Sequence, residues 1–423
     1  MLVAGEEIFF LDYQADQSKA ILYAPLRSYL GLLKKAAMDD FLKEGSRTRQ
    51  PILERLKAKP LIDPERILQD TQNRNPELAL ALTDNCNLRC KYCHASAGDT
   101  GKTKSMTVAF VDSIIDKYFQ QIRKPEGDDS IRISFSGGGE PTVVFSLLKH
   151  AVKRCKGHAA AKGMRCWFSM ATNGCYGNTV RQYIIENFTN ISLSFDGPAH
   201  IQNRHRPHKG GAGSFDAVLK TAKYFYRNDF PFAVRVTVSE YSMEYLEEII
   251  DFFSSELPGI QIGFEPLLPM GRARKNTDLR SPDDHQFAKR LIEIMDYAKG
   301  KKVTISYSGA VDYDCVRSVF CTSVAVPNWT VKVDGTVAAC TRDDAPEIFV
   351  YGSYDAAHDK LILDADAIEK IRALNVMNYE ECRDCFAKYH CAGDCPDRRL
   401  SNRISCDAIR QVGSHMLNSK IDA

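Results

Sequence analysis

The stretch TDNCNLRCKYCH at residues 83–94 decides how the rest of the chain is interpreted. It carries Cys86, Cys90 and Cys93 in a C-x3-C-x2-C spacing and follows the apolar run ELALALT at 77–83, which predicts a strand. A loop held by a strand can present all three thiolates to one site. A [4Fe–4S] cluster held by protein alone takes four thiolates. The spacing therefore predicts a cluster with one iron left open for another molecule.

A zinc knuckle with His94 or a distant residue as its fourth ligand is the alternative for this loop. The chain beyond the loop favours the cluster, because polar signatures follow or end the next predicted strands. They are Gly138, Gly139 and Glu140 after 131–137, Asn173 after 166–172, and Ser194 and Asp196 within 190–197. In parallel sheets, ligands bind where the strands end. These signatures therefore indicate one shared site.

Six short apolar runs alternate with helix-like stretches between residues 77 and 270. They lie at 77–83, 131–137, 166–172, 190–197, 233–239 and 260–266. After the first run, Val111, Ile114, Ile115 and Tyr118 repeat at helical spacing and predict one buried face. Strands that alternate with helices predict parallel β/α units, and six units are too few for a closed eight-unit barrel. We therefore expect an α/β fold with an open, partial (β/α)6 barrel.

Length, charge and cysteine content restrict the function further. A chain of 423 residues suggests two to three domains, and 56 Lys and Arg against 54 Asp and Glu leave a net charge of +2. This balance disfavours nucleic-acid and polybasic membrane binders. The start MLVAGEEIFFLDYQ lacks the basic residues of a signal peptide, and no apolar run is long enough to span a membrane. We therefore expect the 14 cysteines in a cytoplasmic metal protein rather than in disulfides.

The sequence predicts four parts along the chain. Residues 1–75 form a small α+β extension with strands at 7–13 and 20–30 and two short helices, as a packing element or as a module that binds a peptide. Residues 76–300 form the barrel, and residues 301–412 form a Cys-rich iron–sulfur domain. Residues 413–423 begin with GSHM, which resembles a cloning scar, and are given no functional weight.

The Cys-rich part holds eight cysteines, the ligand count of two fully protein-bound [4Fe–4S] clusters. They are Cys315, Cys321, Cys340, Cys382, Cys385, Cys391, Cys395 and Cys406. Cys340 ends a predicted hairpin at 334–340. Two four-cysteine zinc sites are the alternative. The three remaining thiols fit no cluster spacing and are expected in the core or at the surface: Cys155, Cys166 and Cys175.

These motifs together resemble the radical S-adenosylmethionine (SAM) enzymes that carry a C-terminal SPASM extension. The resemblance implies that Cys86, Cys90 and Cys93 hold a [4Fe–4S] cluster whose open iron binds SAM. Arg206 resembles the arginine that pairs with the SAM carboxylate; an ordinary surface salt bridge is the alternative, and Arg204 is a near competitor. The other expected SAM-binding residues are Tyr92 near adenine, Gly138, Gly139 and Glu140 at the amino group, and Asn173, Ser194 and Asp196.

The same resemblance divides the eight later cysteines between two auxiliary [4Fe–4S] clusters. The first set is Cys315, Cys321, Cys340 and Cys395, and the second is Cys382, Cys385, Cys391 and Cys406. Every iron of both clusters is then bound by cysteine, so we expect them to accept an electron rather than to bind substrate. The implied external reductant is a one-electron carrier such as flavodoxin or ferredoxin.

The activity that the resemblance implies is peptide modification. A 5′-deoxyadenosyl radical would abstract hydrogen from a ribosomally made precursor peptide, and an intrapeptide cross-link would form, carbon–carbon or carbon–heteroatom. Formylglycine formation in sulfatases, or another protein side-chain oxidation, is the alternative. The sulfatase-maturing group carries an Asp directly after the hairpin cysteine, where this chain has Thr341. Asp343, Asp344 and Glu265 are candidates for a base. A non-catalytic iron–sulfur carrier or a zinc scaffold is the alternative from another class.

Overall fold

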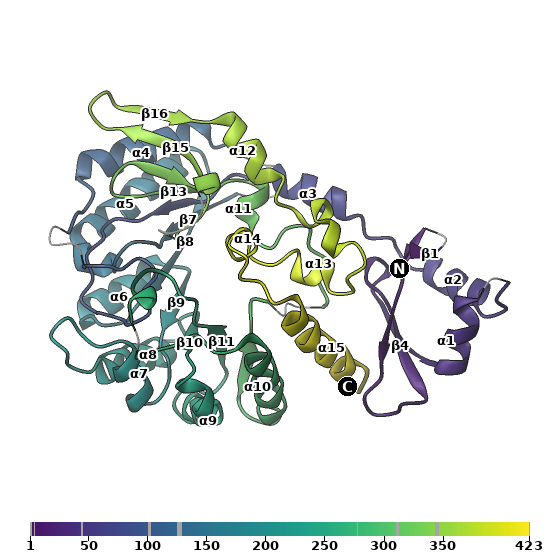
Figure 1. Ribbon diagram of the computed structural model, residues 1–423. Coiled ribbons are helices and arrows are strands. Elements are labelled where there is room, and N and C mark those ends of the chain that lie inside the picture. Colours follow the sequence, from purple (N-terminus) through teal and green to yellow (C-terminus); the bar gives the residue numbers. More distant parts are fainter. Residues whose placement is uncertain are drawn as a thin grey trace. The chain divides into compact units, whose positions relative to one another are not determined.

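The computed structural model describes residues 2–3, 5–43, 45–99, 103–124, 129–276, 278–309, 313–342 and 347–422 (Figure 1). The chain divides into two compact units, each assembled from separate segments. The smaller unit comprises Met1–Asn73, Gly309–Cys321 and Ala373–Ala423, and the larger comprises Arg74–Ser308 and Thr322–Arg372. Among the described helices, none is long and apolar enough to cross a membrane.

The larger unit is built on one sheet, in which the described strands follow the order β12-β11-β10-β9-β8-β7-β6-β13-β14-β15-β16. The parallel strands of the barrel are β6 (Leu78–Leu80), β7 (Ser130–Phe135), β8 (Arg165–Thr172), β9 (Asn190–Ser194), β10 (Phe232–Val238), β11 (Ile260–Pro266) and β12 (Val303–Ser306). Because they are parallel, their carboxyl ends meet at one edge. That edge is where ligands of such sheets bind.

Helices follow the strands around this sheet and cover it with apolar faces (Figure 1). The helices are α4 (Val108–Gln121), α5 (Phe145–Ala161), α6 (Asn178–Asn187), α7 (Ala199–His205), α8 (Phe215–Arg227), α9 (Leu246–Glu256) and α10 (Asp284–Tyr297). Helix α4 begins at the Thr107 cap, whose hydroxyl accepts from the Phe110 amide. It buries Val111, Ile114 and Tyr118, as their spacing predicts. The mixed α/β class with a parallel sheet is therefore confirmed.

All six predicted strands of the barrel are present, and among the described residues β12 adds a seventh parallel strand to the barrel beyond β11. Strand β12 pairs in parallel with β11, with Val303 opposite Ile260. The four residues of β12 lie where the chain becomes Cys-rich. Four residues are too few to show the apolar pattern that predicts a strand. The open sheet is thus longer than six strands on the β11 side.

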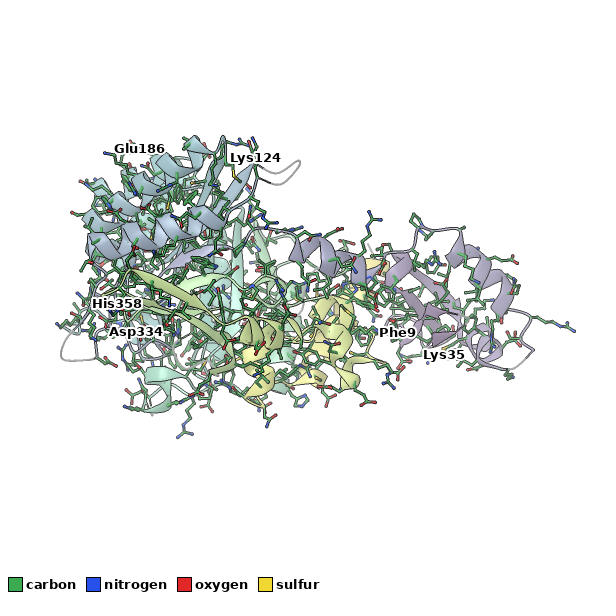
Figure 2. The ribbon with its side chains drawn as sticks, turned by 90° about the horizontal axis from the view of Figure 1, so that it is seen from above. Phe9, Lys35, Lys124, Glu186, Asp334 and His358 are labelled. Carbon is green, nitrogen blue, oxygen red and sulfur yellow. The ribbon has the colours of Figure 1, made fainter. Side chains whose placement is uncertain are left out.

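The predicted hairpin before Cys340 also belongs to this sheet. Strand β13 (Trp329–Val331) pairs in parallel with β6, and β14 (Thr336–Ala338) pairs antiparallel with β13. Strands β15 (Val350–Asp355) and β16 (Lys360–Leu363) continue the sheet, and helices α11 (Thr322–Ala325) and α12 (Ala365–Arg372) flank them. Figure 2 labels Asp334 and His358 in the two turns of these antiparallel strands. Packing thus groups residues 322–372 with the barrel, whereas the linear boundaries predicted from the sequence stay a proposal.

The smaller unit contains an antiparallel sheet of β3 (Phe9–Asp12), β4 (Lys19–Ala24) and β5 (Tyr29–Lys34). The predicted strand at 20–30 is in fact two strands, because a 3-10 turn at Pro25–Arg27 and Ser28, with φ of 46°, reverse the chain. Helices α1 (Lys35–Leu42), α2 (Arg49–Lys57) and α3 (Pro64–Gln72) follow. Phe9 and Lys35, labelled in Figure 2, mark the starts of β3 and α1. Phe41 and Leu56 pack against Leu22 of the sheet.

The C-terminal segment is not the loose tail that GSHM suggests. Helix α15 (Cys406–Asp422) runs through residues 413–416 without a break. Leu417 is 1% exposed and packs with Phe9 and Tyr23 of the antiparallel sheet. The Asn418 side chain accepts from the Gln14 amide at 2.8 Å. Residues 413–422 therefore belong to a helix that packs into the core of the smaller unit, and the origin of the GSHM string stays a prediction.

Candidate active site

The loop that carries Cys86, Cys90 and Cys93 follows β6 and is fixed by its backbone. The Arg89 amide donates to the Pro207 carbonyl at 2.7 Å, and the Lys91 amide donates to the His205 carbonyl at 2.9 Å. On another side, the Arg272 guanidinium donates to the Cys90 carbonyl at 2.5 Å, and the Arg272 amide donates to the Cys93 carbonyl. The three thiols are therefore presented from a loop whose course is set by several neighbouring segments.

The three thiols of this loop converge and form no disulfide. Burial, together with nearby negative charge that includes Cys93, raises the pKa of Cys86 to about 11 and that of Cys90 to about 12, although Arg206 opposes the rise at Cys90. Such thiols become thiolates readily only beside strong positive charge, which the irons of a cluster would supply. Within the described part of the chain, no three His, Cys, Asp or Glu side chains are arranged to hold a single metal ion. Three thiols close enough for their charges to act on one another are the donors that a [4Fe–4S] cluster with one open iron would take.

The glycine loop after β7 lies directly against the start of the cysteine loop. The Gly139 amide donates to the Thr83 carbonyl at 2.7 Å, and the Glu140 amide donates to the Asn85 carbonyl at 2.9 Å. Gly138 has a φ of 63°, and a Cβ on Gly139 would lie 1.8 Å from the Asn85 oxygen. The glycines thus allow two backbones to touch. Their expected contact with the SAM amino group stays a prediction.

Glu140 connects the ends of neighbouring strands. Its buried carboxylate accepts from the Thr142 and Thr172 hydroxyls, each at 2.8 Å, and from the Asn173 amide at 2.8 Å. Burial raises the pKa of Glu140, and these hydrogen bonds oppose the rise. Glu140 therefore has a structural task at the site that the sequence did not indicate. Its expected contact with an ammonium group stays a prediction.

Asn173, at the end of β8, lies beside the first thiol. Its Nδ2 atom is 3.6 Å from the Cys86 sulfur and donates to the Asn87 side chain at 2.8 Å. Ser194 ends β9 at the same edge of the sheet. Three of the predicted polar signatures, after β6, β7 and β8, are thus in direct contact with one another.

A buried polar network follows β9. Asp196, which is fully buried, accepts at Oδ2 from the Tyr92 hydroxyl, from Arg206 Nε at 3.1 Å and from His205 Nδ1 at 3.1 Å. Its Oδ1 atom accepts from the Thr237 amide at 2.9 Å. Burial by itself raises the pKa of Asp196, but Arg206 and the hydrogen bond from His205 outweigh it and lower that pKa to about 2. Asp196 is therefore the counter-charge that holds Arg206 and Tyr92 in place.

Arg206 connects this network to the thiols. Its Nη1 atom is 3.8 Å from the Cys90 sulfur, and its guanidinium lies 5.0 Å from the centre of the Tyr92 ring. Arg206 is buried, so the surface salt bridge offered as the alternative is wrong, although a buried ion pair with Asp196 is present. The competitor Arg204 instead lies over the Tyr241 ring at 4.2 Å. Of these two competitors, Arg206 is the one that lies beside a thiol of the cysteine loop.

His205 is a site residue that was not predicted. It is fully buried, packs edge-on against Tyr92 with ring centres 5.6 Å apart, and hydrogen-bonds both Asp196 and the Ser239 hydroxyl. Its only signal in the sequence is its position directly before Arg206 in the stretch HIQNRHR. A histidine in a polar stretch gives no periodic pattern, so the sequence could not assign it to the site.

The structure gives no geometric support for the three candidate bases Glu265, Asp343 and Asp344. Glu265, at the end of β11, accepts from the Ser308 hydroxyl at 2.7 Å and pairs with Arg235 at 3.3 Å, so its carboxylate is already engaged. Asp343 and Asp344 lie outside the described residues. A base is therefore a prediction only.

Four of the later cysteines gather within the smaller unit. They are Cys382, Cys385, Cys391 and Cys406, which were predicted to hold the second auxiliary cluster. Burial raises the pKa of Cys391, and the charges of Asp394 and the other three thiols raise it further. Arg399 Nη2 donates toward the Cys382 sulfur at 3.5 Å. Cys382 is buried and the other three are half-buried, and these mutually close thiols with an N–H donor fit a four-cysteine cluster.

The other predicted set is divided between the units. Cys315, Cys321 and Cys395 belong to the smaller unit, and Cys340 belongs to the larger. That ligand set therefore stays a prediction. Of the three thiols expected outside clusters, Cys155 and Cys175 are buried and Cys166 is half-buried, which agrees with core positions.

Comparisons with known proteins agree with this geometry. Residues 80–253 match the family model of the Radical SAM superfamily. The cysteine-type anaerobic sulfatase-maturating enzyme of Clostridium perfringens is 23% identical over 354 residues, which are 78% of this chain and 92% of that protein. The serine-type enzyme of Klebsiella aerogenes is 26% identical over 327 residues, 74% of this chain and 77% of that protein.

Solved structures show the same fold. Native anSMEcpe with bound AdoMet and the Cp18Cys peptide has a TM-score of 0.66 at 19% identity and covers 82% of this chain and 99% of that one. Streptococcus suis SuiB bound to the precursor peptide SuiA has a TM-score of 0.54 at 14% identity and covers 95% of this chain and 97% of that one. At these identities the likeness concerns the fold.

Proposed function

We propose, on the premise that residues 80–253 form a radical SAM domain, that the chain is an enzyme that oxidises a peptide substrate. The observation that carries this proposal is the convergence of Cys86, Cys90 and Cys93 at the carboxyl edge of the parallel sheet, with Arg206 and Asn173 donating to two of the sulfurs. A structural zinc knuckle needs neither a buried arginine at its sulfur nor an adjoining glycine loop.

The residues at this edge fit a [4Fe–4S] cluster and SAM. The three thiolates would hold the cluster, and together the two groups supply, when bound, a carbon radical that removes a hydrogen atom from substrate. Arg206 is held on the thiolate side by Asp196, so its remaining donors can bind a carboxylate there. Tyr92 lies against Arg206 and would border the adenine. Gly138 and Gly139 keep their backbone close to the cysteine loop, near the expected amino group.

The later cysteines support an electron path out of the substrate. After a hydrogen atom has left, closing a new bond requires the loss of one proton and one electron. Two clusters, one bound by Cys315, Cys321, Cys340 and Cys395 and one by Cys382, Cys385, Cys391 and Cys406, would leave no iron open to substrate. We infer that they accept this electron, while an external carrier such as flavodoxin or ferredoxin reduces the SAM-binding cluster.

We propose an intrapeptide cross-link in a ribosomally made precursor as the product. Thr341 follows Cys340 where the sulfatase-maturing group carries Asp, which disfavours that group's chemistry. The antiparallel sheet of β3, β4 and β5 offers a strand edge to which an extended leader peptide could add. A fold neighbour with a bound precursor peptide covers more of the chain than anSMEcpe does, which also supports this substrate class.

Formylglycine formation is the second candidate, because the curated relatives that cover most of the chain are sulfatase-maturating enzymes. A cross-linked peptide and a formylglycine made from serine have each lost two hydrogen atoms. Only formylglycine carries an aldehyde. A mass change alone therefore does not separate the candidates, whereas reaction with a hydrazide does.

The test uses anaerobically reconstituted full-length protein, SAM, a reductant and two peptides. One peptide is a precursor encoded beside the gene, and the other is a synthetic sulfatase peptide with the target Cys or Ser. We expect the precursor to lose two hydrogens and stay unreactive to hydrazide, with fragmentation blocked inside the linked ring. A hydrazide-reactive sulfatase peptide would instead establish the second candidate.

The control variant is Cys90→Ala, which removes one ligand of the open cluster. We expect it to form no 5′-deoxyadenosine and to leave both peptides unchanged. If the unmodified protein, loaded with iron, also formed no 5′-deoxyadenosine, an electron carrier would be the better assignment. Zinc in place of iron after reconstitution would indicate a scaffold.

A further inference from the structure

A cavity lined by several cations lies in the larger unit, between helices α6 and α8. Its volume is about 380 Å³. The cations that line it are Arg181 from α6 and Lys220, Lys223 and Arg227 from α8, and the one lining carboxylate is Asp216. The cavity therefore carries an excess of positive charge, although the chain as a whole is almost neutral.

Arg181 is the unusual member of this lining. It is 4% exposed, and its Nε atom donates to the Thr221 hydroxyl at 2.9 Å while Nη1 donates to the Asn178 side chain at 2.7 Å. Both acceptors are uncharged. Among the described residues, no carboxylate lies within ion-pair distance of Arg181, and Glu186 on the same helix, labelled in Figure 2, accepts from Gln182 instead.

A buried guanidinium without a counter-charge is costly, and buried charges in proteins are generally paired. Burial accordingly lowers the pKa of Arg181. The neighbouring cations increase the cost, because Lys223 alone has a carboxylate partner, Glu256, and Lys220 and Arg227 have none within the described chain. A bound anion would supply the missing charge and accept from the unused guanidinium donors.

We propose that this cavity binds the phosphate group of a small molecule, with Arg181 at its base. A guanidinium matches the oxygens of phosphate or carboxylate, but four lining cations suit a doubly charged phosphate better than a single carboxylate. The cavity is larger than a phosphate ion, and the side chains of Leu219 and Tyr224 offer apolar surface that the carbon part of a ligand could contact. A phosphate monoester therefore fits the cavity better than the free ion. This proposal is independent of the peptide chemistry.

The test measures binding of glycerol 3-phosphate, inorganic phosphate and acetate to the full-length protein by calorimetry at constant ionic strength. We expect both phosphates to bind, the ester more tightly, and acetate to bind at least tenfold more weakly than either. Tighter binding of inorganic phosphate would identify the free ion as the ligand and overturn the monoester. Acetate that binds as well as phosphate would overturn the choice of phosphate.

Variants place the ligand in the cavity. Lys220 and Arg227 are exposed on α8, so Lys220→Gln and Arg227→Gln are expected to fold. Each should weaken phosphate binding about tenfold. Arg181→Gln should weaken it more strongly. Lys289→Gln on the exposed face of α10 removes the same charge elsewhere and should bind like the unchanged protein. If Lys220→Gln and Arg227→Gln bound no more weakly than Lys289→Gln, the site would not be this cavity, whether or not Arg181→Gln folds.

Discussion

At the scale of single residues, arginines beside cysteine sulfur recur at both thiol sites. Arg206 lies 3.8 Å from Cys90, and Arg399 lies 3.5 Å from Cys382. Hydrogen bonds and positive charge at the sulfurs stabilise the reduced form of a cluster, which carries more negative charge. Each arginine would therefore favour reduction of the cluster proposed at its own thiol site.

We expect Arg399→Gln to lower the reduction potential of the auxiliary cluster bound by Cys382 by about 60 mV, which is a tenfold change for a one-electron couple. A redox titration followed by electron paramagnetic resonance measures this potential directly. The matched control is Arg383→Gln, because Arg383 is exposed and pairs with Glu380 instead. Equal shifts in both variants would show that charge at a distance, rather than the contact with sulfur, sets the potential.

The ion pair of Glu6 with Arg27 makes stability depend on pH. Arg27 donates to the two Glu6 oxygens at 2.6 and 2.8 Å, and the pair is buried. The hydrogen bond from Arg27 lowers the pKa of Glu6, and burial opposes the effect. A carboxyl with a lowered folded-state pKa stabilises the fold above its unfolded pKa of 4.5, and this contribution is lost as pH falls through the folded value.

Glu6→Gln should therefore destabilise the protein by about 2 kcal/mol at pH 7 and by clearly less at pH 3. Melting temperatures at the two pH values give this comparison. Glu65→Gln removes an exposed carboxylate in the same unit and serves as the control. If the Glu6–Arg27 ion pair does not stabilise the fold, Glu6→Gln and Glu65→Gln should have the same melting temperature at pH 7.

At the scale of elements, the contact between the glycine loop and the cysteine loop determines the site. Gly139→Ala would place a Cβ 1.8 Å from the Asn85 oxygen, so one of the two loops must move. We expect it to cost at least about 3 kcal/mol and to lower the iron content of the reconstituted protein. Gly177→Ala is the control, since nothing lies within 4 Å of its Cβ position. Full iron loading in Gly139→Ala would show that the contact is not needed.

Periodic elements were predictable from the sequence, and irregular ones were not. The six apolar runs are strands because each is long enough to show its pattern between turn residues. Strand β12 is four residues long, and the reversal at Ser28 depends on a left-handed residue that is not glycine, so neither had a readable signal. The burial of Leu417, directly after the GSHM string, is visible only in the fold, because this stretch has no readable pattern.

The candidate site was predictable where chemistry limits the residue type. Cysteine spacing, the glycine loop and Arg206 each have few substitutes, and the structure brings them together. His205 and the bonds of Glu140 depend on which backbone atoms lie nearby, which the sequence does not specify. The burial of Arg181 without a carboxylate partner was likewise not predictable from the sequence, because an arginine on a helix is usually exposed to solvent.

At the scale of the whole molecule, neither unit is a continuous stretch of chain. Leu417 from the last helix is buried against Phe9 and Tyr23 near the start. Leu417→Ala should destabilise the smaller unit by about 2–5 kcal/mol through loss of packing. Limited proteolysis would report this as earlier cleavage within residues 1–73, with Ser419→Ala on the same helix as the control. Unchanged cleavage in Leu417→Ala would mean that α15 does not hold the sheet.

Residues 12–14 are joined to residues 418–422 by direct contacts. The Tyr13 hydroxyl donates to Asp422 at 2.6 Å, and Asn418 bonds to Asp12 and Gln14. During vectorial synthesis the first strands leave the ribosome long before the helix that covers them, by a delay on the order of tens of seconds. During that interval the sheet of β3, β4 and β5 exposes to water the apolar side chains that α15 later covers. We expect this to make a chaperone important early in biogenesis, before any iron is inserted.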